Sequence, residues 1–181
     1  PLIALFTGMR LNEICQLYVE DVRNHDDVPC ISVTDENNIE DAKKRLKSSS
    51  ASRLIPIHKK LLALGFLDFV EAVRSDGNIR LFPDLEADTR GYYSDAFQKW
   101  FSRFIKGLDA KTPKTTFHSF RHSFRDAMRN ASISEDVARA LGGWADQRTS
   151  EIYGSGFSVA RLNDAIQRIE YSGLRLPPRM F

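Results

Sequence analysis

A histidine and an arginine three positions apart, His118 and Arg121, are the first residues whose types and spacing suggest chemistry. If a helix begins at His118, the imidazole and the guanidinium lie on one helix face, beside backbone N–H groups that have no acceptor within the helix. Donors gathered in this way favour the binding of an anion. Taken alone, the same spacing is more often a capped helix with a solvated arginine.

A second arginine, Arg10, follows a Thr7-Gly8 break and therefore lies near another predicted helix start. Glu13 lies three positions later on the same side of that helix, where its carboxylate can accept hydrogen bonds from a cationic group and orient it. A surface ion pair between Arg10 and Glu13 is the simpler alternative.

Tyr153 closes a polar segment and is followed by Gly154-Ser-Gly156, whose small residues allow a close approach. Its phenol is a potential nucleophile, although a buried structural tyrosine is the ordinary role of a single tyrosine. Trp144 has an indole N–H donor and no ionisable proton. In a site it would donate a hydrogen bond, and otherwise it would fill the core at a helix end.

Three lysines, Lys43, Lys44 and Lys47, precede a predicted strand that begins at Arg53. Most basic runs of this kind are solvated, but a lysine on a hairpin can also reach into a groove and deliver a proton. Lys47 is selected among the three by its distance along the chain to Arg53.

In this order and at these spacings, the residues resemble the pattern of the tyrosine recombinase (phage integrase) family. The segments that carry the resemblance are Thr7-Gly-Met-Arg10-Leu-Asn-Glu13, Lys47 with Arg53-Leu-Ile-Pro56, His118-Ser-Phe-Arg121, and Leu141-Gly-Gly-Trp144 nine positions before Tyr153. Trp144 stands where most members of the family carry a histidine. The resemblance extends over residues 2 to about 170.

This resemblance implies a site-specific DNA recombinase or integrase, in which a tyrosine attacks a DNA phosphate to form a 3′-phosphotyrosine and the ends are then rejoined. The implied catalytic residues are Arg10, Lys47, His118, Arg121, Trp144 and the nucleophile Tyr153, with Glu13 and His122 in supporting positions. The reaction implied needs no metal, cofactor or ATP. The implied partner is double-stranded DNA, bound by a homotetramer, with a monomer as the alternative for the isolated chain.

The resemblance also implies the fold class: α+β, mainly α, a helical tyrosine-recombinase catalytic domain with a small three-stranded antiparallel sheet. The sequence begins at Pro1, and we expect it not to include the arm and core-binding domain that are usual at the N-terminus of the family. Residues 1–181 are therefore expected to be the catalytic domain, as a fragment of a longer cytoplasmic protein encoded by a bacterium or a phage.

Two other functions fit part of this pattern. A type IB topoisomerase shares the arginine, lysine, histidine and tyrosine chemistry, and it would relax supercoils as a monomer without site preference. The spacing from Trp144 to Tyr153 favours the recombinase. A non-catalytic DNA-binding module of the same fold has no need for a tyrosine at that fixed distance, because binding alone requires only basic and polar contacts.

The elements that must position these residues follow from apolar periodicity. Helices are predicted over residues 2–18 with a break at Thr7-Gly8, and over 59–74, 92–108, 118–130, 132–142 and 159–169. A capping box, Ser132-x-x-Glu135, opens the fifth of these, and Gly142-Gly143 ends it. A single stripe over 92–108 predicts a core helix; it consists of Phe97, Phe101, Phe104, Ile105 and Leu108.

Alternating or branched residues predict strands over 30–34 and 53–57, with a weaker candidate at 42–46 and a turn over 47–52. These would form the three-stranded antiparallel sheet. No apolar run approaches the ~18 residues of a membrane span, so the chain is predicted to be soluble and free of any membrane.

Composition sets wider bounds. The 42% hydrophobic and 28% charged residues are typical of a globular domain that folds without metal or disulfide bonds. A net charge of +2 and a pI near 8.7 permit a polyanionic partner without requiring one. Cys15 and Cys30 form no C-x-x-C pair, which favours two reduced thiols in a cytosolic protein over a disulfide.

Overall fold

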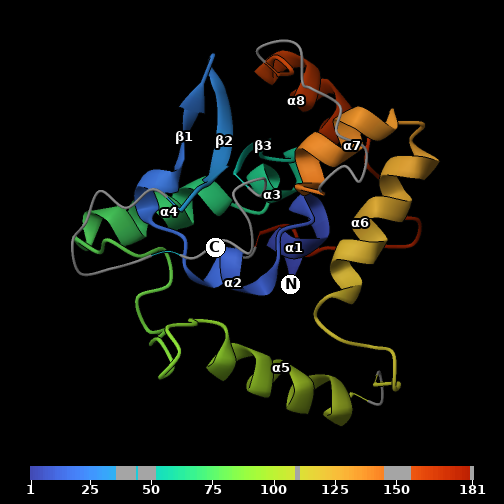
Figure 1. Cartoon of the computed structure of the whole chain (residues 1–181). Helices are drawn as coiled ribbons and strands as arrows, with labels where there is room; N and C mark the ends of the chain where they lie inside the picture. The colour runs from blue at the N-terminus through green and yellow to red at the C-terminus, as the bar shows by residue number, and fades with distance from the viewer. Residues whose placement is uncertain (36–43, 45–51, 109–110, 145–155, 180–181) are drawn as a thin grey trace.

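Helix α1 (Leu2–Thr7) lies at the centre of the computed structural model, which describes residues 1–35, 44, 52–108, 111–144 and 156–179 (Figure 1). Its residues from Ile3 to Thr7 are buried, and α6 (Ser119–Asn130) packs against it. The helix ends at Gly8, whose φ of 65° is left-handed and whose Cα lies so near Phe124 that a Cβ would meet that ring at 2.4 Å. The predicted break is confirmed, and it redirects the chain into α2 (Leu11–Cys15).

Three short strands form the antiparallel sheet in the order β1 (Val22–His25), β2 (Val28–Val33) and β3 (Arg53–Pro56). Val22, Ile31 and Ile55 stand opposite one another across the three strands, and all three are buried. One face of the sheet is thereby fixed toward the core, which excludes a one-residue shift of any strand, because such a shift would turn its buried side chains to the other face. The mainly helical α+β fold with its small sheet is as predicted.

One strand of that sheet differs from the prediction. The candidate at 42–46 lies outside the described residues except for Lys44, which is in no strand, and the third strand is instead β1. In β1 only Val22 is apolar, because this is an edge strand with most side chains toward solvent. The missed signal is the turn Asp26-Asp27, where φ values of 47° and 60° are those of a two-residue hairpin.

The remaining helices are η1 (Val19–Asp21), α3 (Lys59–Ala63), α4 (Phe66–Ser75), α5 (Asp95–Gly107), α7 (Glu135–Gly142) and α8 (Val159–Gln167). The single helix predicted over 59–74 is wrong, because Leu64 ends α3 and Gly65 adopts a φ of 88° before α4 begins. The predicted capping box is also wrong. Ser134 occupies the N-cap of α7, whereas Ser132 belongs to the turn that ends α6 and donates its N–H to the Arg129 carbonyl.

Helix α5 is a core helix on only one side. Phe101 and Ile105 are buried, but Phe104 is 47% exposed and Leu108 62% exposed, so the predicted stripe of core residues is only partly correct. Figure 1 shows α5 at the lower edge of the molecule, away from the sheet. The outer half of the helix has no element above it within the described part of the chain to cover it.

The C-terminal segment folds back onto its own chain. Helix α8 packs against β3 and α7, and the Gln167 side chain donates to the Ile57 carbonyl and accepts from the Lys59 N–H. The buried His58 ring stacks on Phe6, with Nε2 3.1 Å from the Ile169 carbonyl. No helix in the described ranges is long and apolar enough to cross a membrane. Cys15 and Cys30 are both buried free thiols.

Candidate active site

Arg10 stands at the N-cap of α2, where Glu13 of the first turn holds it at two points. The Arg10 backbone N–H donates to Glu13 Oε2 at 2.9 Å, and Nη1 donates to Oε1 at 2.6 Å. This is the contact that the three-residue spacing predicts. The Glu13 side chain is 4% exposed and that of Arg10 is 28% exposed, so the carboxylate is internal while part of the guanidinium remains accessible.

A second guanidinium reaches the same carboxylate from the sheet. Arg53, the first residue of β3, donates from Nη2 to Glu13 Oε2 at 2.8 Å, and its side chain is also only 4% exposed. Burial alone would raise the pKa of Glu13, but the charge and hydrogen bonds of Arg53, with the hydrogen bonds of Arg10, outweigh it. The pKa of Glu13 therefore lies below its ordinary value, and the group is a carboxylate at neutral pH.

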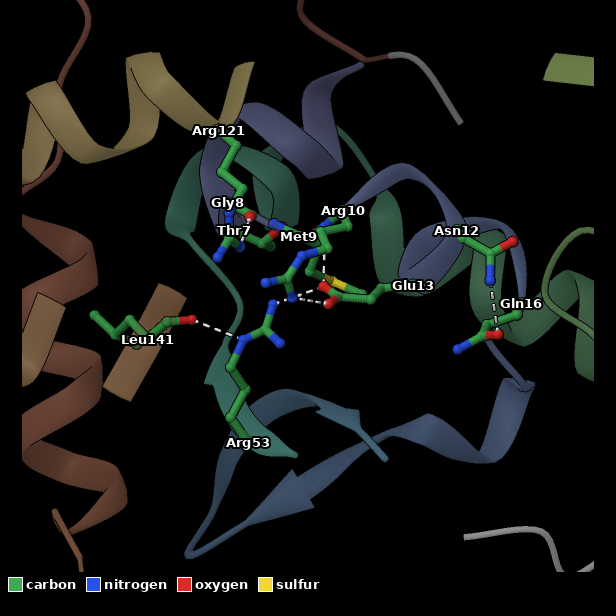
Figure 2. A network of polar contacts seen from close by, with 10 residues as sticks. All are labelled: Thr7, Gly8, Met9, Arg10, Asn12, Glu13, Gln16, Arg53, Arg121 and Leu141. Atoms are coloured by element: carbon green, nitrogen blue, oxygen red, sulfur yellow. Dashed lines mark hydrogen bonds and ion pairs between the residues drawn. The ribbon is translucent and has the colours of Figure 1, made fainter. Parts of the chain in front are cut away.

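Arg53 also donates a hydrogen bond to the end of α7. Its Nε donates to the Leu141 carbonyl at 3.0 Å, one of the last carbonyls of that helix (Figure 2). The chain then leaves α7 through Gly143, which has a left-handed φ of 61° and lies so close that a Cβ there would meet Arg53 Nη1 at 2.8 Å. Glycine is required here both for the backbone conformation and for the approach of Arg53.

Arg121 projects from the first turn of α6 toward the end of α1. Its side chain is buried, and Nη1 donates to the Gly8 carbonyl at 2.5 Å. Nη2 is buried without a hydrogen-bond partner among the described residues. Burial, followed by the charges of Arg10 and Arg53, lowers the pKa of Arg121 to about 10. The group remains a cation at neutral pH, but it is repelled by its neighbours, and an anion placed here would relieve that repulsion.

Trp144 lies against two of the cations of α6. The guanidinium carbon of Arg121 is 4.7 Å from the centre of the indole ring, and that of Arg125 is 5.2 Å away, both within cation–π range. A Cβ at Gly142 would meet the indole at 2.1 Å, so the glycine makes room for the ring. The two glycines therefore make room for different side chains: Gly142 for Trp144, and Gly143 for Arg53.

His118 is the N-cap residue of α6 and is exposed, as is His122 one turn later. The two imidazole rings meet edge to face with centres 5.0 Å apart. His118 and Arg10 line one open hollow of about 450 Å³ between α2, α5 and the start of α6. The two residues therefore border the same space, although they come from distant parts of the sequence.

Two of the six predicted catalytic residues, Lys47 and Tyr153, lie outside the described residues, and so does Lys43. Lys44 is described, and its ammonium donates to Asp21 at 2.5 Å and lies 4.2 Å from the centre of the Tyr18 ring. The Lys44 side chain is only 3% exposed, so its ammonium is buried in the contact with Asp21. Among the described residues no three His, Cys, Asp or Glu side chains gather as metal ligands.

The residue that sequence reasoning missed is Arg53. It served there only to mark the strand after the hairpin lysines, yet it contacts the carboxylate that holds Arg10. Its two acceptors, Glu13 and Leu141, lie 40 positions before it and 88 positions after it. No local pattern indicates either contact; the only available signal was that Arg53 is a charged residue opening an otherwise apolar strand.

The geometry defines a helical domain with a small sheet, in which arginines from three separate elements lie around the buried carboxylate of Glu13. The chain belongs to the phage integrase family, whose model matches residues 2–156.

Solved structures of similar fold include integrases. The integrase from mycobacterium phage Brujita aligns with a TM-score of 0.60 and 18% identity, over 97% of this chain and 52% of that one. The Tn1549 transposon integrase, solved in complex with a circular intermediate DNA, aligns with a TM-score of 0.56 and 20% identity, over 80% of this chain and 49% of that one. The chain thus spans about half the length of these integrases. No curated protein matches it significantly.

Proposed function

We propose that this chain is the catalytic domain of a tyrosine-type site-specific recombinase, which cleaves and rejoins double-stranded DNA. Membership of the phage integrase family supports the proposal. The observation that carries it is Arg121 Nη2, a buried donor with no partner in the described part of the chain, beside Arg10. Two guanidinium groups, those of Arg10 and Arg53, pair with the carboxylate of Glu13, and the nearby Arg121 adds a third positive charge without an ion pair to it, so the site has the excess charge and the unpaired donor to bind a phosphodiester.

In the proposed reaction Arg10 and Arg121 bind the two non-bridging oxygens of the scissile phosphate and stabilise the charge of the pentacoordinate transition state. The Tyr153 phenolate oxygen attacks phosphorus, and His118 accepts the phenol proton. Trp144 donates its indole N–H to a phosphate oxygen. The bond from phosphorus to the 5′-oxygen breaks, and Lys47 donates a proton to that oxygen.

The product is a 3′-phosphotyrosine and a free 5′-hydroxyl. Because the phosphodiester has been exchanged for another phosphodiester, attack by a 5′-hydroxyl of a second strand reverses the step without ATP. A guanidinium site also replaces the metal ions that many phosphoryl-transfer enzymes use. Recombination, as opposed to nicking and resealing, requires four protomers assembled on two DNA sites.

The test is covalent capture of DNA by the isolated chain. A library of nicked suicide duplexes with randomised half-sites is incubated with protein in EDTA, and adducts that survive SDS are isolated and sequenced. We expect the parent chain to form an adduct through the 3′-phosphate, and Tyr153→Phe to lower its yield by at least about 10³-fold because the nucleophile is lost. Tyr92→Phe, which removes the hydroxyl of an exposed tyrosine, is the matched control and should retain the adduct.

Each other result has a defined meaning. An adduct formed by Tyr153→Phe would reject Tyr153 as the nucleophile. Binding of the duplexes by the parent chain without any adduct would identify a non-catalytic DNA-binding module. Relaxation of supercoiled plasmids of any sequence by a monomer would identify a type IB topoisomerase activity.

A further inference from the structure

Arg53, like Arg121, links two halves of the site: the segment that carries Arg10 and the end of α7 before Trp144. Its guanidinium contacts Glu13, the carboxylate that holds Arg10, and the Leu141 carbonyl at the end of α7, three positions before Trp144. We propose that Arg53 is a positioning residue, which fixes Arg10 and Trp144 in relation to each other for the cleavage step. This inference rests on the proposed function, because it assigns Arg53 a role in that same site.

On the Arg10 side, Arg53 fixes the plane of the carboxylate. Glu13 Oε2 accepts from both the Arg10 backbone and Arg53 Nη2, which leaves Oε1 directed at Arg10 Nη1. Glu13 and Arg53 are each 4% exposed, so solvent contributes little to their orientation. The direction of the Arg10 guanidinium therefore depends on the ion pair between Arg53 and Glu13.

On the Trp144 side, Arg53 supports the point where the chain leaves α7. The Leu141 carbonyl is among the four at a helix end that receive no helical hydrogen bond, and Arg53 Nε supplies the donor. Gly143 packs directly on the Arg53 side chain, and the next residue, Trp144, lies over Arg121 at 4.7 Å. A shift of the α7 end would therefore move the indole relative to Arg121.

The arrangement requires arginine and not merely a positive charge. Two different nitrogens, Nε and Nη2, reach two acceptors on opposite sides, and the planar guanidinium holds their directions fixed. The single ammonium of lysine cannot donate along both directions with the same geometry. Arg53 is itself held by β3, where it pairs with Val33 of β2.

The first test measures the cleavage step in a single turnover at saturating DNA, using a duplex captured by the parent chain. We expect Arg53→Ala to lower the rate constant of adduct formation by about 10²-fold and Arg53→Lys by about 10-fold, because misplacement of a catalytic group costs this much. His58→Ala is the matched control. It removes a buried side chain that holds the C-terminal segment and touches none of the catalytic residues.

A loss of folding and a loss of positioning give different data. If Arg53 only stabilises the fold, its variants lower the amount of adduct in proportion to the folded fraction and leave the rate constant of the remainder unchanged, as is expected for His58→Ala. A duplex with sulfur in place of the leaving 5′-oxygen separates the roles further, because a thiolate departs without a proton. This substrate should rescue Lys47→Ala but not Arg53→Ala.

The second test needs neither DNA nor activity. The chain has two tryptophans, Trp100 and Trp144, so in a Trp100→Phe background all tryptophan fluorescence comes from Trp144. We expect Arg53→Ala to raise the acrylamide quenching constant of Trp144 about twofold, and His58→Ala to leave it unchanged. Arg53 variants that keep both the rate constant and the quenching constant of the parent would overturn the proposal. Absence of an adduct in the parent would reject the proposed function, and the quenching constant alone would then decide for or against Arg53.

Discussion

Two regions of the molecule are held in opposite ways: helix α5 and the arginine site, which consists of Arg10, Glu13, Arg53 and Arg121. Arg53 and Arg121 are buried charged residues, and each is fixed by hydrogen bonds to elements distant in sequence. Helix α5 carries its exposed aromatic rings on one flank, where Trp100 and Phe104 stack on each other with centres 5.1 Å apart. The rings of this pair lie on the same helix, so their contact places α5 against nothing else.

The difference shows where the sequence of this protein is most constrained. A buried charge is costly unless each donor meets an acceptor, so the arginine site tolerates few arrangements of α1, α2, β3 and α7. An exposed ring loses little when its surroundings change. Substitutions on the two regions should therefore differ by an order of magnitude in their effect on stability.

The largest effect is expected at Glu13. Glu13→Ala leaves the buried Arg53 without its carboxylate, and we expect the free energy of unfolding to fall by about 3–5 kcal/mol, measured by urea denaturation. The control is Asp126→Ala, which breaks an exposed ion pair with Arg129 and should cost less than about 1 kcal/mol. Equal losses in the two variants would show that the arginine site is no more tightly specified than the surface.

An intermediate effect on the free energy of unfolding is expected when the pH is lowered. Burial, with a smaller contribution from Lys59 and Lys60, lowers the pKa of His58 from 6.5 to about 4. Between these values the unfolded chain binds a proton that the folded chain excludes, so the free energy of unfolding falls as the pH is lowered. We expect a loss of about 1.5 kcal/mol between pH 6.5 and 5, because each pH unit is worth about 1.4 kcal/mol once the unfolded imidazole is fully protonated and about half of that near pH 6.5.

His58→Gln provides the comparison for this pH dependence. The variant has no imidazole to titrate, so the slope of stability against pH between 6.5 and 5 should be smaller than in the parent. Glu13, whose pKa is lowered, loses its contribution only at more acidic pH and leaves this interval clear. Identical slopes in the parent and His58→Gln would mean that the buried imidazole does not govern stability here.

The smallest effect is expected on the outer flank of α5. Phe104→Ala should change the free energy of unfolding by no more than about 0.5 kcal/mol, because the side chain is 47% exposed. Phe101→Ala, three positions earlier and buried against Phe117, should cost about 3 kcal/mol or more. A cost for Phe104→Ala close to that of Phe101→Ala, again by urea denaturation, would remove the contrast between this flank and the interior.

Local spacing predicts those parts of the site that lie within one helix turn. The contact of Arg10 with Glu13, the position of His118 at the start of α6 and the breaks at Gly8 and Gly143 all follow from residues at most four apart. The resemblance to a known family supplied the overall fold. These features required no knowledge of the tertiary structure.

Local spacing does not predict contacts between residues that are distant in the sequence. Arg53 and Glu13 are 40 positions apart, and their pairing depends on how β3 registers with β2, which a hydrophobic pattern alone does not fix. Strand β1 was missed for a related reason, since an edge strand with one apolar residue shows no alternation. The interruption of the helix at Gly65 was likewise hidden, because the apolar pattern continues across it.

The bond from Arg121 to the Gly8 carbonyl spans 113 positions. During synthesis, the residues around Gly8 emerge long before Arg121 exists, and Leu141 follows later still. At about 5–20 residues per second, several seconds separate the appearance of the first arginine from the completion of its surroundings. A chain whose translation stops before α6 therefore contains Arg10, Glu13 and Arg53 but lacks both Arg121 and the Leu141 carbonyl, the two groups that complete their surroundings in the folded protein.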